Sequence, residues 1–185
     1  MRLHIVSWNV NGLHMNGIHG PRKLLLRQEL ISHFPGGVDV LLAQEHKLSL
    51  DHSHRCGKLL PGVSHTFWAP AIGDMSRSGG VCISIGRRFI SHIQHHGILI
   101  PGRALWVSLL IDGRSYGLLS IYAPTDARAR SLFWDTLAQS LPCMDSWIVG
   151  GDFNNVELPS DVSFEGTPRI SSIAPCERER AGIFL

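Results

Sequence analysis

Short apolar segments separated by turn residues recur along this chain, and they constrain its fold more than any other feature. The segments are residues 3–8, 38–43, 64–69, 80–85, 105–111, 115–123 and 147–150. Each has the length of a β-strand, and Gly, Pro, Asn or Asp residues lie between them. The nearly all-apolar run 38–43 favours a strand that is buried on both faces. Asp112-Gly113-Arg114 favours a hairpin between two of the later segments.

Two other segments have the spacing of amphipathic helices. Residues 23–34 repeat apolar side chains at helical intervals and lie between Pro21 and Pro35. Residues 127–141 show the same periodicity and end before Pro142. Strands with a hairpin among them, combined with one or two helices, predict an α+β (α/β) sandwich with mostly antiparallel sheets.

The composition excludes a disordered or membrane-spanning chain. Of the 185 residues, 44% are hydrophobic and 17% are charged, and the formal net charge is only +2. Disorder goes with low hydrophobicity and high net charge, and no apolar stretch approaches the ~18 residues of a membrane helix. The length fits one domain, which we expect over residues 1–160, followed by an irregular tail over 161–185.

Cysteine spacing and the first residues indicate the compartment. The four cysteines contain no C-x-x-C pair, so we expect neither a cysteine zinc site nor a disulfide scaffold. The first residues lack the basic, apolar and small-residue order of a signal peptide. We therefore expect an intracellular protein, nuclear or cytoplasmic, that is not secreted and has no transmembrane segment.

Polar side chains stand where several apolar segments end. They are Asn9, Asn11, Gln44, Glu45, Tyr122, Asp152 and Asn154. Strand ends that converge on one edge of a sandwich would gather these side chains in one pocket. Buried carboxylates require a cation or hydrogen bonds, and carboxylate and amide oxygens suit Mg²⁺, with Mn²⁺ as an alternative. The pattern therefore predicts an oxygen-rich metal site.

Each of these residues also has a simpler structural explanation. The sequence at 151–154 and the pair Asn11-Gly12 are typical of turns. Tyr122 suits a core aromatic, and Glu45 suits a carboxylate that faces water at a strand end. His46 is not expected to share a pocket with Glu45, because adjacent strand residues point to opposite faces. Spacing alone leaves these alternatives open.

Five motifs occur in order and carry a family resemblance. They are Ser7-Trp8-Asn9-Val10-Asn11-Gly12-Leu13, Gln44-Glu45-His46, Arg77-Ser78-Gly79-Gly80-Val81, Ile121-Tyr122-Ala123-Pro124 and Gly150-Gly151-Asp152-Phe153-Asn154. In this order they resemble the endonuclease/exonuclease/phosphatase superfamily of Mg²⁺-dependent phosphodiesterases related to apurinic endonucleases. Phe133-Trp134 and residues 147–156 resemble, more narrowly, the endonuclease domain of plant-type LINE non-LTR retrotransposons. The resemblance covers residues 3 to about 161.

The resemblance implies roles for the polar residues. Glu45 would be the main metal-binding carboxylate, and Asn9 would support the metal site. Tyr122 would hydrogen-bond the scissile phosphate, and Asn154 would bind a phosphate oxygen. Asp152 would orient or activate the attacking water, or protonate the leaving group. Such a site would combine charge neutralisation by Mg²⁺ with in-line attack of water.

The resemblance also implies a fold and partners. The fold would be an incomplete four-layer αββα sandwich of two packed sheets flanked by helices. DNA would be the substrate, and a full-length relative would carry a fused reverse transcriptase. Asn11 stands where related nucleases carry Asp or Asn.

The sequence departs from the family pattern in its last part. Thr125 follows Tyr-Ala-Pro where many family nucleases carry Asn. The family completes its site with a late aspartate and a histidine, but no histidine follows His96, and Asp161 is the only aspartate after Asp152. We therefore expect a chain that is truncated before its last strands and is inactive or strongly impaired. The alternatives are a non-catalytic retroelement remnant, a nucleic-acid binding fragment, and a phosphatase or lipid/inositol phosphodiesterase of the same superfamily.

Overall fold

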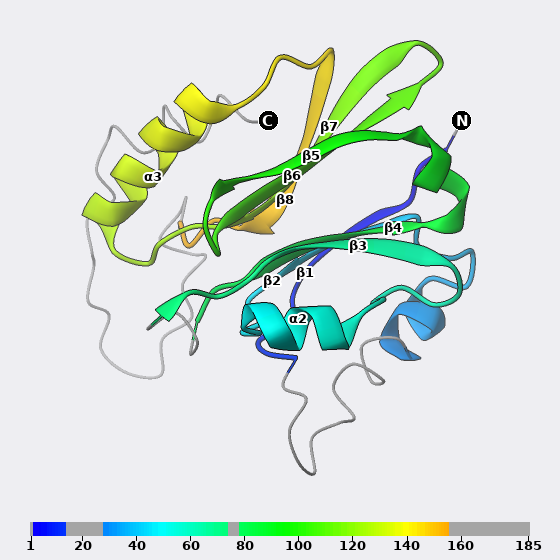
Figure 1. Ribbon diagram of the computed structural model, residues 1–185, viewed down its shortest axis with the longest axis horizontal. Coiled ribbons are helices and arrows are strands. Elements are labelled where there is room, and N and C mark those ends of the chain that lie inside the picture. The colour runs from blue at the N-terminus through cyan, green and yellow to red at the C-terminus, as the bar shows by residue number, and fades with distance from the viewer. Residues whose placement is uncertain (1, 14–27, 74–77, 156–185) are drawn as a thin grey trace.

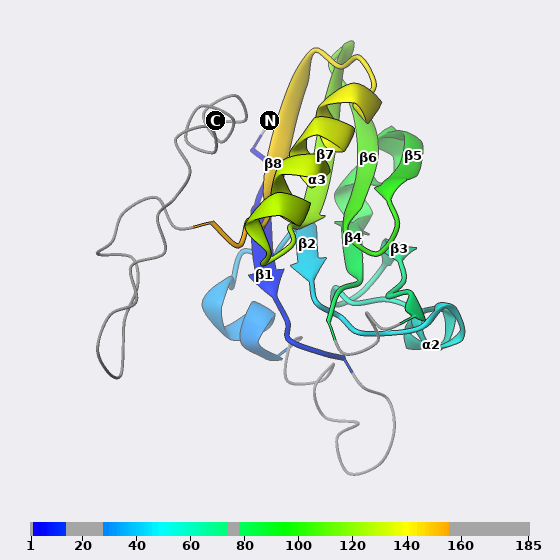
Figure 2. The ribbon, with the colours of Figure 1, turned by 90° about the vertical axis from the view of Figure 1, so that its left-hand side faces the viewer.

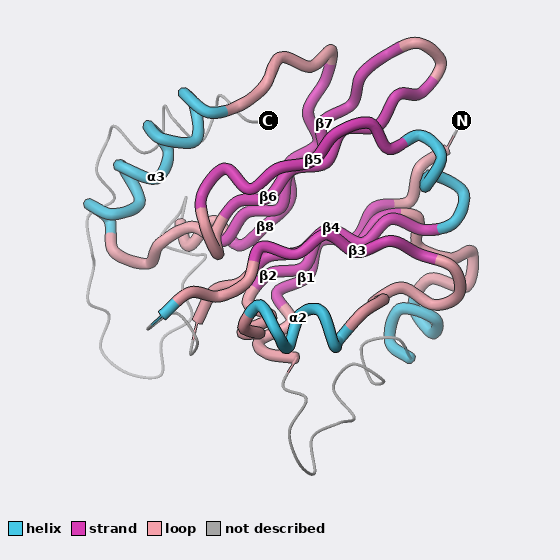
Figure 3. Tube along the Cα trace, viewed as in Figure 1, coloured by secondary structure: helices cyan, strands magenta, loops and turns pink. Residues whose placement is uncertain are grey.

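Two four-stranded sheets packed face to face form the body of this protein. The computed structural model describes residues 2–13, 28–73 and 78–155. The strand orders are β1-β2-β4-β3 and β5-β6-β7-β8. Figure 1 shows the sheets one above the other, with α2 outside the first sheet and α3 outside the second. The helices thus cover the outer faces of the strands (Figure 3), and the expected four-layer αββα sandwich is confirmed.

The first sheet combines one parallel pair with two antiparallel pairs. Its strands are β1 (Ile5–Asn9), β2 (Val40–Gln44), β3 (Ser64–Ala69) and β4 (Val81–Gly86). β1 runs parallel to β2, whereas β4 runs antiparallel to both β2 and β3. Because β1 and β2 run in the same direction, Asn9 and Gln44 pair where both strands end.

The second sheet repeats this arrangement with a meander. Its strands are β5 (Ile93–Ile100), β6 (Ala104–Ile111), β7 (Arg114–Tyr122) and β8 (Ser146–Asp152). β5, β6 and β7 pair antiparallel, and α3 (Ala127–Ser140) connects β7 to the parallel strand β8. Tyr122 therefore pairs with Asp152 where both strands end. The sheets are mostly antiparallel as expected, but each contains one parallel pair.

Strand β2 shows why the layers pack as they do. Val40 and Leu42 belong to the core between the two sheets. Leu41 and Ala43 face the opposite way, into a second apolar cluster that includes Cys56 of α2 (Leu50–Cys56). All residues of β2 are buried, which confirms the strand predicted from the apolar run. A third cluster packs Phe133, Trp134 and Leu137 of α3 against the outer face of the second sheet.

Most of the strands expected from sequence are confirmed, with ends that differ by one or two residues. Sequence patterns missed β5, α2 and the short 3-10 helix Arg87–His92. β5 was missed because it is an edge strand, so three consecutive polar side chains (Gln94, His95 and His96) are exposed there.

Parts of two other predictions lie outside the described residues. Of the helix expected over 23–34, only residues 28–33 are described as helical, and the expected tail 161–185 lies wholly outside the described residues. Within the described ranges, no helix combines the length and apolar character needed to cross a membrane.

Candidate active site

One amide nitrogen joins carboxylates from the two sheets at the edge where the parallel strands end. Asn9 Nδ2 donates to Glu45 Oε1 at 2.9 Å and to Asp152 Oδ2 at 2.8 Å. Asn9 ends β1, Glu45 follows β2 and Asp152 ends β8, so the contact connects residues 143 positions apart. Figure 2 shows β1 and β8 side by side with their ends in the same direction. The structure thus brings these predicted site residues to one point.

The orientation of the Asn9 amide is fixed by its other end. Asn9 Oδ1 accepts a hydrogen bond from the backbone N–H of Asn11 at 3.0 Å. The nitrogen must therefore face the two carboxylates, although amide oxygen and nitrogen are otherwise hard to distinguish. Asn9 consequently holds Glu45 and Asp152 close together through its donor end. Its oxygen is engaged in the turn after β1.

Glu45 is placed by a strained but well-anchored turn. Glu45 has φ of 54° and Lys47 has φ of 58°, which is uncommon for residues other than glycine. Gly12 N–H donates to the Glu45 carbonyl at 2.6 Å, and Lys47 N–H donates to the Gly79 carbonyl at 3.0 Å. Asn11 and Asn154 also have positive φ. Such conformations concentrate at functional sites, where the surrounding structure holds them.

The His46 side chain points away from the site and is buried, where it supports the turn that carries Glu45. Its side chain is fully buried, and its ring meets the Trp68 ring edge-on at 5.1 Å. A Cβ on Gly80, which has φ of 82°, would lie 2.5 Å from the His46 ring. Burial lowers the pKa of His46 to about 4, so the ring is neutral near pH 7. The expectation that His46 and Glu45 face opposite sides is confirmed.

Lys47 belongs to the site, and the sequence analysis missed it. Its Nζ lies 3.2 Å from Glu45 Oε2 and also donates to Asn11 Oδ1. Burial raises the pKa of Glu45, but the hydrogen bonds from Asn9 and Lys47 and the Lys47 charge outweigh it, so the pKa lies below its usual value. Its place two residues after Glu45 was the available signal, but a single lysine in the turn after β2 forms no pattern of its own.

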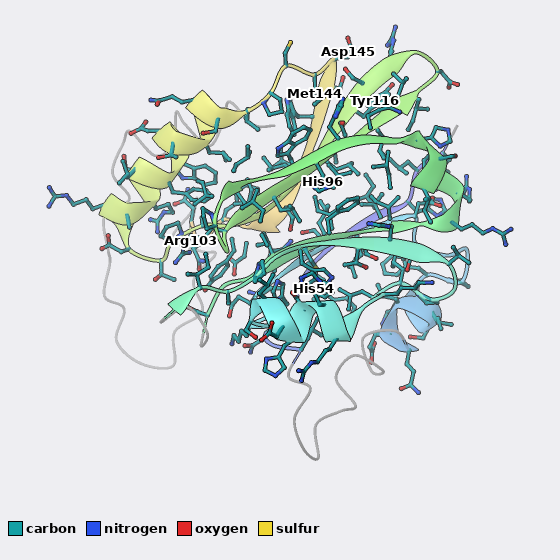
Figure 4. All side chains as sticks on the ribbon, viewed as in Figure 1. His54, His96, Arg103, Tyr116, Met144 and Asp145 are labelled. Atoms are coloured by element: carbon teal, nitrogen blue, oxygen red, sulfur yellow. The ribbon has the colours of Figure 1, made fainter. Side chains whose placement is uncertain are left out.

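Tyr122 closes the other side of the carboxylate pair. Its side chain is largely buried, and burial raises the pKa of its hydroxyl, with the nearby Glu45 carboxylate raising it further. The phenol therefore stays protonated and can donate. Arg103, which the sequence analysis also missed, stacks over the Tyr122 ring at 5.3 Å and donates to the Tyr122 carbonyl at 3.2 Å. Figure 4 labels Arg103 in the turn between β5 and β6, at the edge where β8 ends.

Asn154 fixes the turn that follows Asp152. Its backbone N–H donates to Asp152 Oδ1 at 3.0 Å, and its Nδ2 donates to the Ala123 carbonyl at 2.7 Å. The first bond is the turn chemistry that a Gly-Asp-x-Asn sequence predicts. Asp152 therefore serves the turn through Oδ1 and meets Asn9 through Oδ2. Asp152 thus has one oxygen in the predicted turn and the other beside the predicted site residues, so the turn does not exclude a role in a site.

A cavity opens beside the carboxylates. Its volume is about 480 Å³, and it is lined by Ser7, Asn9, Gln44, Gly151, Asp152, Phe153, Asn154 and Asn155. Gln44 is buried at its base, where Nε2 donates to Ser7 Oγ at 3.3 Å and to Ser120 Oγ at 3.1 Å. These bonds tie the two sheets together below the cavity. The cavity is large enough for a small polar group such as a phosphodiester.

The donor set of the site fits a hard cation. The two carboxylates offer oxygen ligands, which Mg²⁺ prefers, and Mg²⁺ keeps several waters or phosphate oxygens in its shell. Among the described residues, no group of three or more His, Cys, Asp or Glu side chains could hold a metal ion. A cation here would thus rest on Glu45, with water or substrate as further ligands.

The same sandwich fold occurs in solved structures of an AP endonuclease and of a retrotransposon endonuclease domain. The chain belongs to the Endonuclease/Exonuclease/phosphatase family, whose model matches residues 6–172. The family resemblance carried by the five sequence motifs is thereby confirmed.

The chain is also similar in sequence to a transposon protein and in fold to solved nuclease structures. It is 41% identical over 155 residues to the Transposon TX1 uncharacterized 149 kDa protein of Xenopus laevis, which is 80% of this chain and 11% of that protein. The fold is similar to the AP endonuclease LMAP from Leishmania major (TM-score 0.66, 19% identity, 89% of this chain, 59% of that one). It is also similar to the endonuclease domain of TRAS1, a telomere-specific non-LTR retrotransposon (TM-score 0.53, 15% identity, 84% of this chain, 62% of that one). The domain is thus related to retrotransposon endonucleases.

Proposed function

We propose that this domain cleaves the phosphodiester backbone of DNA in a Mg²⁺-dependent reaction. The observation that carries the proposal is the Asn9 amide nitrogen, which holds Glu45 and Asp152 at 2.9 and 2.8 Å beside a cavity. Two carboxylates that share one donor lie close enough to repel each other, so a bound cation would stabilise the pair. The transposon relative and the family favour DNA over a lipid or a small phosphate ester as substrate.

Each side chain receives one task in this proposal. A bound Mg²⁺ would supply charge neutralisation on the phosphate. Glu45 would hold the cation, while Asn9 would keep the Glu45 and Asp152 carboxylates close together. Asp152 would orient the attacking water, whose oxygen bonds to phosphorus as the bond to the leaving sugar oxygen breaks. Tyr122 would donate its proton in a hydrogen bond to a phosphate oxygen, because its hydroxyl remains protonated.

Two further residues would bind the substrate. Asn154 borders the cavity and would donate to a second phosphate oxygen. Asn11 holds the Lys47 ammonium and lies beside the carboxylates, so it would shape the cation site rather than touch the substrate. In a longer protein of the transposon type, a fused reverse transcriptase would be the partner of this domain. Mn²⁺ would replace Mg²⁺, because both prefer oxygen ligands.

We also propose that this chain by itself is a slow nuclease. Within the described ranges, no histidine hydrogen-bonds to Glu45 or Asp152, and His46 is buried on the far side of the turn. No histidine follows His96 in the sequence. A positioned general acid or base contributes about 10²–10⁴-fold. Added imidazole should therefore accelerate cleavage if the missing proton carrier limits the rate.

The test is nicking of supercoiled DNA by the purified chain in Mg²⁺ and in EDTA. We expect slow nicking that requires Mg²⁺ and is lost in Glu45→Gln and Asp152→Asn. Asp145→Asn is the matched control, because Asp145 is an exposed carboxylate that binds Ser115 instead. Nicking that persists in EDTA or in Asp152→Asn would contradict the proposal. Hydrolysis of an inositol phosphate without DNA nicking would favour the other substrate class of the family.

A further inference from the structure

We propose that Lys47 is an internal counter-cation of this site, which occupies Glu45 until a divalent cation displaces it. This inference rests on the proposed metal site. Lys47 Nζ lies 3.2 Å from Glu45 Oε2, while Asn9 Nδ2 occupies Glu45 Oε1 at 2.9 Å. Both oxygens of the carboxylate therefore have a donor. A divalent cation at Glu45 would face the like charge of the Lys47 ammonium, so the two cations compete for the carboxylate.

The ammonium is the donor that can leave. Asn9 is held at both ends of its amide, by Asn11 N–H on one side and by the carboxylates on the other. Lys47 reaches Glu45 with the end of a long side chain that has several rotatable bonds. Its other contact in the site is Asn11 Oδ1. Displacing Lys47 breaks one ion pair and leaves the Asn9 bridge between Glu45 and Asp152 intact.

Lys47 is built into the site and is not a surface lysine with a chance partner. Its side chain and that of Glu45 are each only 16% exposed. Its backbone N–H donates to the Gly79 carbonyl at 3.0 Å, and the next residue donates from Leu48 N–H to His46 Nδ1 at 3.0 Å. These bonds hold Lys47 at φ of 58°. The fold thus maintains an unfavourable backbone conformation that directs an ammonium at Glu45.

The charge of the site explains what Lys47 does. Glu45 and Asp152 both meet the same nitrogen, so two negative charges lie close together. Lys47 supplies one positive charge, which stabilises the pair in the absence of a metal ion and competes with any cation that arrives. Lys47 therefore lowers the affinity for a divalent cation while keeping the site assembled. A merely structural lysine would do the reverse, since its loss would loosen Glu45 and weaken metal binding.

The experiment measures bound Mn²⁺ directly, by the loss of the free-ion signal in electron paramagnetic resonance, and needs no turnover. We expect Lys47→Met to bind Mn²⁺ about tenfold more tightly than the wild-type chain, because a partly buried ion pair no longer competes. Lys47→Gln keeps a donor for Asn11 without the charge and should behave similarly. Lys47→Arg keeps the charge and should remain close to wild type. Lys58→Met, which removes an exposed lysine outside the site, should change the affinity less than about twofold.

Thermal melts give a second readout on the same proteins. In EDTA, Lys47→Met should melt below the wild-type chain, because two neighbouring carboxylates lose their counter-charge, and saturating Mn²⁺ should remove that difference. Mn²⁺ affinity that is unchanged or weaker in both Lys47→Met and Lys47→Gln would overturn the inference. Failure of the underlying metal site has a different signature: Glu45→Gln would then bind Mn²⁺ as the wild-type chain does.

Discussion

Two carboxylates flank the five residues of β2, and they have opposite surroundings. Asp39 precedes the strand and accepts from the His4 backbone N–H at 3.0 Å and from Arg88 Nη1 at 3.2 and 3.3 Å. Glu45 follows the strand and accepts from a side-chain amide and from the Lys47 ammonium. Asp39 is not among the residues with positive φ, whereas Glu45 has φ of 54°.

The two carboxylates therefore differ in the kind of donor that holds them. The backbone donor of Asp39 cannot rotate away, and the planar guanidinium of Arg88 bonds both of its oxygens. Together they tie β1 and the 3-10 helix to β2. The donors of Glu45 are all side chains, and one of them, Asn9, lines the cavity. Asp39 is held partly by a backbone N–H, which is fixed in place, whereas Glu45 is held by side chains that can change rotamer.

The largest expected effect comes from breaking the link between the sheets at the site end of β2. Asn9→Ala removes the donor that Glu45 and Asp152 share, so the two carboxylates should repel each other and lose their common geometry. We expect nicking to fall about 10²-fold, as when one preorganised donor is lost, and Mn²⁺ affinity to fall with it. Asn9 is exposed, so the melting temperature should change little. A variant with normal nicking would show that the shared donor is dispensable.

Removing the carboxylate at the other end of β2 should have the opposite effects: a loss of stability and an unchanged Mn²⁺ affinity. Asp39→Ala removes a largely buried carboxylate with three hydrogen bonds, and we expect unfolding in urea to lose about 2–3 kcal/mol of stability. Mn²⁺ affinity should stay at the wild-type value. Arg88→Met is the matched comparison: Arg88 is 56% exposed, so its loss should cost at most about 1 kcal/mol. A large drop in Mn²⁺ affinity in Asp39→Ala would remove the distinction between the two ends.

Gly150 tests how closely the sheets must approach below the site. A Cβ on Gly150 would lie 2.7 Å from Leu42 Cδ1 and 3.0 Å from Ser7 Cβ, so Gly150→Ala must shift the Leu42 side chain or Ser7 on the facing sheet. We expect a loss of about 1–2 kcal/mol in urea unfolding, with a smaller loss of Mn²⁺ affinity. Gly36→Ala is the control, because its nearest neighbour would be the His4 ring at 3.7 Å. Equal stability of the two variants would mean that the sheets tolerate wider spacing.

The smallest expected effect concerns Asp145, a third carboxylate, which is exposed to solvent and bonded to Ser115. Asp145 accepts from the Ser115 backbone N–H and hydroxyl, both at 2.7 Å, and these bonds lower its pKa. Its contribution to stability is therefore present above the ordinary carboxylate pKa of about 3.9 and is lost as the pH falls through the lowered value. Asp145→Asn should melt slightly lower near neutral pH, and the difference should vanish in acid. A difference that grew in acid would contradict this sign.

The sequence patterns predicted much of the fold and most of the carboxylate site. Apolar runs identified β1 to β4 and β6 to β8, and the polar residues after them include Asn9, Glu45 and Asp152, which the structure brings together. Lys47 and Arg103 were missed, because a lone cation in a loop has no pattern of its own. In the structure, Lys47 pairs with Glu45 two residues before it, and Arg103 lies over the Tyr122 ring, so their place at the site is seen only after folding.

Local patterns in the sequence were enough to locate β1 to β4, β6 to β8 and the polar residues that follow them. Periodicity and turn chemistry depend on residues that are neighbours in the chain, so both can be read from the sequence. The parallel pairing of β1 with β2 and of β7 with β8, and the common edge where both pairs end, became known from the three-dimensional structure. The bond from Asn9 to Asp152 spans 143 positions and forms because two sheets pack face to face. Strand order and sheet packing depend on long-range burial, which no local pattern encodes.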